Sequence, residues 1–134
     1  LHYACQSLRS GECDLALVGG VFVNTTPRFH MLSSRAGMLS PGGRCRTFDE
    51  GADGFVPGEG VGVLVLKPLA RALEDRDLIR GVITATGVNQ DGRTSGITAP
   101  SGASQAALLE SVYRAGGIDP GTIELVECHG TGTP

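Results

Sequence analysis

The chain has 134 residues, 40% of them hydrophobic, and 11 Lys and Arg against 14 Asp and Glu give it a formal net charge of −3. The mild acidity and the lack of a basic block argue against a nucleic-acid partner, and no apolar run is long enough to predict a membrane span. Four cysteines without a CxxC pair argue against a metal site such as zinc and suit free thiols in a reducing cytoplasm. Twenty-one glycines between short apolar runs favour an α/β protein over disorder.

The first half of the chain predicts two helices and two strands. Residues 1–10 place apolar side chains at helical spacing, and Gly11 is suited to end that helix. A buried strand is expected within 14–23, a short helix over 28–39 and a second buried strand over 61–66. Because the sequence begins at Leu1 and ends inside a motif, we expect it to be part of a longer protein.

The segment 44–59 is polar and rich in glycine, which predicts a loop. It contains three carboxylates, at Asp49, Asp53 and Glu59. We interpret them as acceptors for backbone N–H groups, or for Arg44 or Arg46, in preference to metal ligands. The run Gly58-Glu59-Gly60-Val61-Gly62 precedes a strand and has the wrong glycine spacing, so it does not fit a dinucleotide-binding loop.

The second half predicts further alternation of strands and helices. A short helix is expected over 69–77, a strand over 79–88, a helix over 103–115 and a last strand over 123–128. Gly116-Gly117 is suited to end the longer helix. This order of elements predicts an α/β layered sheet.

The chain ends on Glu127-Cys128-His129-Gly130-Thr131-Gly132-Thr133-Pro134, which joins a predicted strand to a His and a Gly-Thr loop. A His at the carboxyl end of a strand lies where ligands bind in α/β sheets, and it can act as acid, base or hydrogen-bond donor. A structural His before a flexible loop fits these residues equally well. Cys128 points to the opposite face of the strand and is interpreted as a small core residue, so a nucleophile for His129 must come from elsewhere. His2 and His30 lie in helical stretches and are interpreted as structural.

Five stretches, in their order along the chain, resemble the ketosynthase (β-ketoacyl synthase) domains of type I polyketide synthases. They are LHYACQSL at 1–8, MLSPGGRCRTFD at 38–49, ADGF at 52–55 with GEG at 58–60, VNQDG at 88–92 and HGTGT at 129–133. The loop at 89–92 and Thr98-Ala99-Pro100 are more similar to polyketide synthases than to stand-alone fatty-acid enzymes.

The resemblance implies a thiolase-like α/β fold with two βαβαβ-type halves, usually paired as a homodimer. This chain would hold the end of the N-terminal half over 1–66 and the start of the C-terminal half over 67–134. The helix at 1–10 would carry the nucleophilic Cys of the family at its buried N-terminus, before Leu1, and Cys5 aligns with a packing position. We therefore expect the nucleophile, a second His and a Lys to lie outside this chain, and the chain alone to be inactive.

The implied reaction is a decarboxylative Claisen condensation between an acyl thioester and a malonyl-type extender carried on acyl carrier protein. His129 matches the first catalytic His, which donates a hydrogen bond to negative charge on the thioester oxygen of the extender. Thr131 and Thr133 match positions that hydrogen-bond the phosphopantetheine arm, and Phe29 is placed near the acyl pocket. Apart from that arm, which is a substrate carrier, no cofactor or metal is implied. The chain departs from the family at Cys128, where Ala is frequent.

Two alternatives stay open on the sequence. One is a fatty-acid-type condensing enzyme with the same fold, and the other is a non-condensing homologue that only binds acyl carrier protein. The residue at the helix start upstream of Leu1 separates condensing from non-condensing forms. In each case we expect a cytoplasmic protein with acyl carrier protein as partner, and neighbouring synthase domains for the polyketide class.

Overall fold

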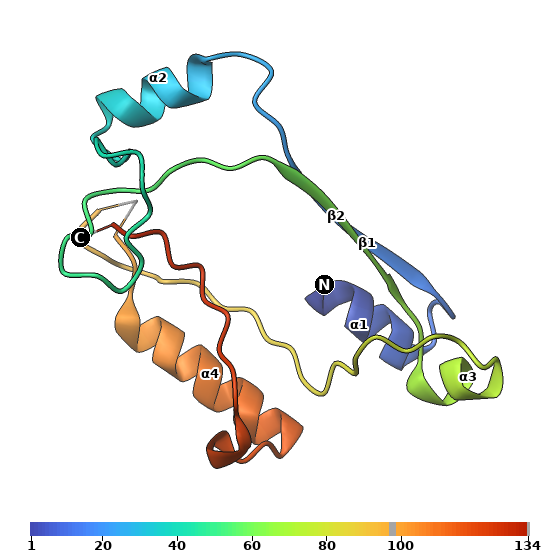
Figure 1. Cartoon of the computed structure of the whole chain (residues 1–134). Helices are drawn as coiled ribbons and strands as arrows, with labels where there is room; N and C mark the ends of the chain where they lie inside the picture. Colours follow the sequence, from blue (N-terminus) through green and yellow to red (C-terminus); the bar gives the residue numbers. More distant parts are fainter. Residues whose placement is uncertain (97–98, 134) are drawn as a thin grey trace. The chain divides into compact units, whose positions relative to one another are not determined.

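The computed structural model describes residues 1–96 and 99–133, so Thr98 of the Thr98-Ala99-Pro100 stretch lies outside the described residues. The elements in chain order are α1 (His2–Ser10), β1 (Ala16–Phe22), α2 (Arg28–Arg35), β2 (Gly60–Leu66), α3 (Leu69–Glu74), α4 (Gly102–Gly116) and the 3-10 helix η1 (Pro120–Thr122) (Figure 1). Among the described residues, no helix is both long enough and apolar enough to cross a membrane.

Contacts within the chain define two compact units, which are described separately. The first comprises Leu1–Val18 and Leu64–Glu124, and the second comprises Gly19–Val63 and Leu125–Pro134. The second unit contains the predicted site residues. It is therefore the unit on which the candidate site depends.

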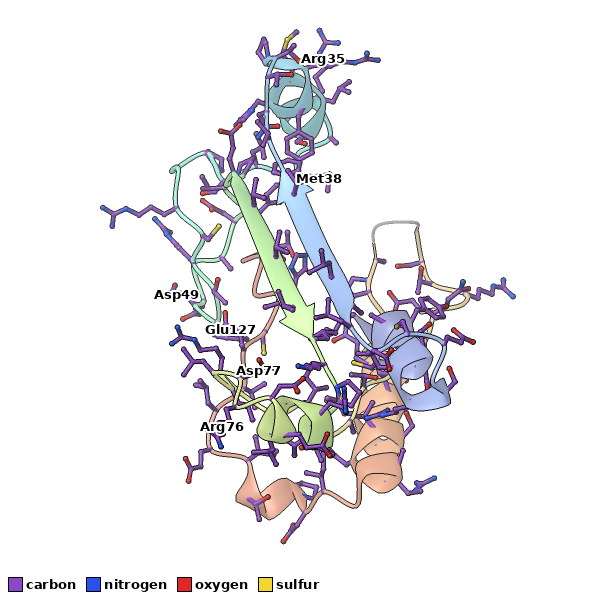
Figure 2. All side chains as sticks on the ribbon, turned by 90° about the vertical axis from the view of Figure 1, so that its right-hand side faces the viewer. Arg35, Met38, Asp49, Arg76, Asp77 and Glu127 are labelled. Atoms are coloured by element: carbon purple, nitrogen blue, oxygen red, sulfur yellow. The ribbon has the colours of Figure 1, made fainter. Side chains whose placement is uncertain are left out.

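Strands β1 and β2 pair in a two-stranded sheet, and Figure 2 shows that they run in opposite directions. Both strands fall where the apolar runs predict them, since β1 lies within 14–23 and β2 starts one residue before 61. The prediction that they are buried is wrong for this chain, because Leu17 is 69% and Val63 is 62% exposed. An apolar run indicates that a strand is suited to burial, but the strand is buried only if other elements pack on both faces of its sheet.

The structure assigns no strand to the predicted segments 79–88 and 123–128. A strand is defined by hydrogen bonds to a neighbouring strand, and within the described residues neither segment has such a partner. The apolar alternation of these segments therefore predicts a suitable side-chain pattern but not a paired strand.

Helices α1 and α4 match their predicted positions closely. Helix α1 ends at Gly11, whose φ of 75° is left-handed, and α4 ends at Gly117, with a φ of 59°. The Ser101 hydroxyl caps α4 at its start by accepting a hydrogen bond from the Ser104 N–H at 3.2 Å. Cys5 is buried on α1, which confirms that it occupies a packing position.

Helices α2 and α3 are shorter than predicted. Helix α2 ends at Arg35 instead of residue 39 (Figure 2). The chain turns just after it, at Gly37, where φ is 67°. Helix α3 ends at Glu74, and Arg76 also has a positive φ, of 58°. In both places a residue with left-handed backbone angles follows the helix and ends it earlier than the side-chain pattern predicts.

The turn after α3 is held by Lys67, which lies just after β2. Its ammonium group forms ion pairs with Asp75 and with Asp77, the latter at 2.6 Å. The hydrogen bonds that Lys67 donates to Asp75 and Asp77 raise the pKa of Lys67, and the one to Asp75 lowers the pKa of that carboxyl. The pair of carboxylates thus fixes the position of α3 relative to the end of β2.

Candidate active site

A cavity of about 300 Å³ lies within the second unit. Its apolar wall comes from the end of β1, the start of α2 and the segment before β2. This wall includes Phe22, Phe29, Phe55 and Val56. Its polar wall is formed by the C-terminal loop, through His129 and Thr131. A small apolar cavity with a few convergent polar groups is the usual form of a ligand site.

The aromatic wall is built by an edge-to-face contact. The rings of Phe22 and Phe29 have centroids 5.1 Å apart and an interplanar angle of 75°. This geometry brings the positive edge of one ring to the negative face of the other. The contact joins the end of β1 to the first turn of α2, and so places Phe29 in the same cavity as His129.

The C-terminal loop brings the remaining predicted site residues together. His129 is exposed, and both it and Thr131 line the cavity. Thr133 is not part of the cavity wall, but its hydroxyl oxygen lies 3.1 Å from that of Thr131, within hydrogen-bond distance. Three of the four predicted residues therefore share one cavity, and the fourth contacts one of them.

The alternating glycines of this loop are required by its close approach to the segment at 46–47. Gly130 and Gly132 have φ values of 52° and 73°. A Cβ on Gly130 would lie 2.6 Å from Cγ2 of Thr47, and one on Gly132 would lie 3.0 Å from the backbone nitrogen of Arg46. The Gly-Thr alternation therefore lets the loop pack against the segment at 46–47 while it presents a hydroxyl between the two glycines.

Three hydrogen-bonded contacts hold the cavity walls. The N–H of Gly54 donates to the carbonyl of Gly132 at 3.0 Å, and the hydroxyl of Thr47 donates to the carbonyl of Gly130. The thiol of Cys45 accepts from the N–H of Val56 at 3.0 Å. No sequence pattern predicts these anchors. Cys45 and Thr47 lie in the stretch at 38–49 that carries the resemblance, but no spacing indicates which backbone groups they contact.

Two of the three carboxylates of the loop, Asp49 and Glu59, bind backbone groups as predicted. Asp49 accepts a hydrogen bond from the N–H of Gly51 at 2.7 Å, and Glu59 accepts one from the N–H of Asn24. Arg46 instead donates to the carbonyl of Gly51 at 3.1 Å. These contacts order the glycine-rich loop that carries the cavity wall, and Asp49 lies at its turn (Figure 2).

The other residues singled out in the sequence lie outside the cavity. Cys128 is exposed, so the prediction that it is a small core residue is wrong. Within the part of the chain that the structure describes, no strand pairs with the segment that carries it, so no sheet layer covers it. His2 is bonded through Nδ1 to the hydroxyl of Thr86 at 2.8 Å, which agrees with a structural role. His30 packs edge-on against Phe29.

Comparison with known families accounts for nearly the whole chain. Residues 1–72 match the family described as "Beta-ketoacyl synthase, N-terminal domain", and residues 80–134 match "Beta-ketoacyl synthase, C-terminal domain". An α/β chain with a His and a Gly-Thr loop at one cavity is compatible with many enzymes, but these two matches are specific. The chain belongs to the beta-ketoacyl synthase family.

Curated relatives are polyketide synthases. The chain is 56% identical over 132 residues to "Polyketide synthase PksL" of Bacillus subtilis, which covers 98% of this chain and 3% of that protein. It is 54% identical over 133 residues to "Highly reducing polyketide synthase ausV" of Aspergillus calidoustus, covering 99% of this chain and 5% of that protein. The chain thus spans a small fraction of the curated relatives that it matches.

Solved structures of ketosynthases match the fold. The ketosynthase from module 6 of the bacillaene synthase of Bacillus subtilis 168 has a TM-score of 0.96 and 56% identity, over 98% of this chain and 24% of that one. An oxazolomycin ketosynthase domain of Streptomyces albus has a TM-score of 0.95 and 39% identity, over the same shares of the two chains. These matches confirm the predicted thiolase-like α/β fold and the resemblance to polyketide ketosynthases.

Proposed function

We propose that the chain is part of a ketosynthase that catalyses decarboxylative Claisen condensation in polyketide biosynthesis. The observation that carries this proposal is the cavity that His129, Thr131 and Phe29 line together, within a chain of the beta-ketoacyl synthase family. The polyketide synthase names of the relatives favour this class over a fatty-acid-type condensing enzyme.

In the proposed reaction, the extender is a malonyl-type thioester on the phosphopantetheine arm of acyl carrier protein. Loss of carbon dioxide leaves its bonding electron pair on the α-carbon, as an enolate with negative charge on the thioester oxygen. An N–H of His129 donates to that oxygen and stabilises the charge as it develops. The α-carbon then attacks the acyl thioester on a cysteine contributed by a segment outside this chain, and the cysteine thiolate leaves.

The threonines are proposed to bind the arm that delivers the extender. The hydroxyls of Thr131 and Thr133 lie 3.1 Å apart, so the amide groups of one arm can bond both. Phe29 is proposed to contact the acyl chain, because an aromatic wall in the cavity that His129 also lines suits an apolar group.

We also propose where the chain lies within a complete ketosynthase domain and which partners that domain has. Residues 1–66 are assigned to the end of the N-terminal ketosynthase half and 67–134 to the start of the C-terminal half. The complete domain is proposed to be a cytoplasmic homodimer that works with acyl carrier protein and with neighbouring polyketide synthase domains.

A chimeric enzyme tests the proposal. In it, this chain replaces the matching segment of the bacillaene module 6 ketosynthase. We call this chimera the host ketosynthase. It is incubated with an acyl thioester and malonyl acyl carrier protein, and acyl loading and β-ketoacyl product are followed by intact-protein mass spectrometry. We expect both loading and product, with the unmodified module as reference. Normal acyl loading without any β-ketoacyl product would refute the condensing function and support the non-condensing alternative.

A further inference from the structure

We infer that Thr47 is a positioning residue for His129, because its hydroxyl holds the loop that presents the imidazole to the cavity. The inference rests on the proposed function of His129. It concerns a residue that lies on the loop between α2 and β2, far from His129 in the sequence.

Both branches of the Thr47 side chain face the C-terminal loop. Oγ1 of Thr47 donates a half-buried hydrogen bond of 2.5 Å to the carbonyl of Gly130, the residue directly after His129. Cγ2 of Thr47 lies 2.6 Å from the place where a Cβ on Gly130 would be. The side chain therefore fixes the orientation of the peptide that follows His129 and also limits how closely that peptide can approach.

A second anchor holds the other end of the same loop. The N–H of Gly54 donates to the carbonyl of Gly132 at 3.0 Å. The residues before and after Thr131 are therefore both held by hydrogen bonds, Gly130 by Thr47 and Gly132 by Gly54. The Gly54 anchor joins two backbone groups, an N–H and a carbonyl. The Thr47 anchor is made by a side chain, and it is the one adjacent to His129.

Loss of the Thr47 hydroxyl releases the Gly130 carbonyl, and the left-handed glycine can then change its backbone angles at little cost. The imidazole of His129 moves with that backbone. A hydrogen-bond donor stabilises developing charge only while it stays at the correct distance and angle. Decarboxylation depends on this donor in the proposed mechanism, whereas acyl loading on the separate cysteine does not.

The test compares three variants of the host ketosynthase. Thr47→Val keeps the shape and removes the hydroxyl, and Thr47→Ser keeps the hydroxyl and removes the methyl group. Thr122→Val is the matched control, because Thr122 also donates to a backbone carbonyl, that of Asp119 at 2.7 Å, but in the first unit. For Thr47→Val we expect kcat for malonyl decarboxylation to fall by about 10- to 100-fold, with KM and acyl loading unchanged. Thr47→Ser restores most of the rate, and Thr122→Val keeps it.

Three results would overturn the inference. Equal decarboxylation by Thr47→Val and Thr122→Val would show that the hydroxyl is not needed. A parallel loss of acyl loading and decarboxylation in Thr47→Val would assign Thr47 a general structural role. If the host without these substitutions loads acyl groups but does not decarboxylate malonyl thioester, the proposed function itself fails, and the inference fails with it.

Discussion

At the scale of single residues, the site depends on glycines at which a side chain would collide with backbone. Gly54 is buried, has a φ of 141° and donates to the C-terminal loop. A Cβ there would lie 2.5 Å from the carbonyl carbon of Leu39 and from the backbone nitrogen of Ser40. The segment that supports the cavity therefore tolerates no side chain at this position.

We predict that Gly54→Ala lowers the unfolding free energy of the host ketosynthase by about 3 kcal/mol, because it combines backbone strain with a steric collision. Gly58→Ala is the matched control, since a Cβ on Gly58 would have no atom within 4 Å. Chemical denaturation of the two variants measures the difference. Equal denaturation midpoints would contradict the packing described for Gly54.

Which residues share the cavity was predictable from the sequence only where a motif or the family resemblance names them. The HGTGT motif identifies His129 and Thr131, and the resemblance places Phe29 near the same site. The contact of Thr47 with Gly130 spans 83 residues and leaves no periodic signal in the sequence. The prediction for Cys128 failed because a small apolar residue at a strand end is buried only if another layer covers it.

At the scale of elements, Lys67 connects the end of β2 to the turn after α3. The pKa of Asp75 is lowered, so its contribution to stability is present above the ordinary pKa of Asp and is lost as the pH falls through the lowered pKa. The pKa of Lys67 is raised, so its contribution is present below the ordinary pKa of Lys and is lost as the pH rises through the raised pKa.

We therefore predict that Lys67→Met lowers the melting temperature of the host ketosynthase most at neutral pH, and less in strong acid, in strong base and in high salt. Arg71→Met is the control, because the pair between Arg71 and Glu74 is more exposed and joins residues of one helix. Thermal denaturation across pH measures both. A Lys67→Met effect that does not vary with pH or salt would contradict an electrostatic role.

Helices were easier to predict than strands, for a physical reason. The hydrogen bonds of α1 and α4 lie within each helix, and their glycine and serine caps are adjacent in sequence. A strand needs a partner from elsewhere, and the segments at 79–88 and 123–128 have the side-chain pattern without the partner. The ends of the helices could therefore be predicted from neighbouring residues in the sequence. The pairing of the strands could be seen only in the structure.

At the scale of the whole molecule, the chain buries few apolar side chains. Among the described residues, the buried hydrophobic ones are Cys5 and Ala72, while Leu125 is 82% exposed. We predict that the isolated chain binds a hydrophobic dye such as ANS and melts without a cooperative transition, because it buries too little apolar surface to offset chain entropy. Calorimetry measures this. A sharp melt of the isolated chain would contradict the prediction.

The most direct measurement of the central claim is malonyl decarboxylation by the His129→Ala variant of the host ketosynthase. The control is His30→Ala, since His30 is exposed and does not line the cavity. If His129 stabilises charge on the extender thioester, its removal lowers the decarboxylation rate by about 100- to 1,000-fold and leaves acyl loading intact. Equal decarboxylation rates for the two variants would contradict the assignment of His129 as the catalytic hydrogen-bond donor.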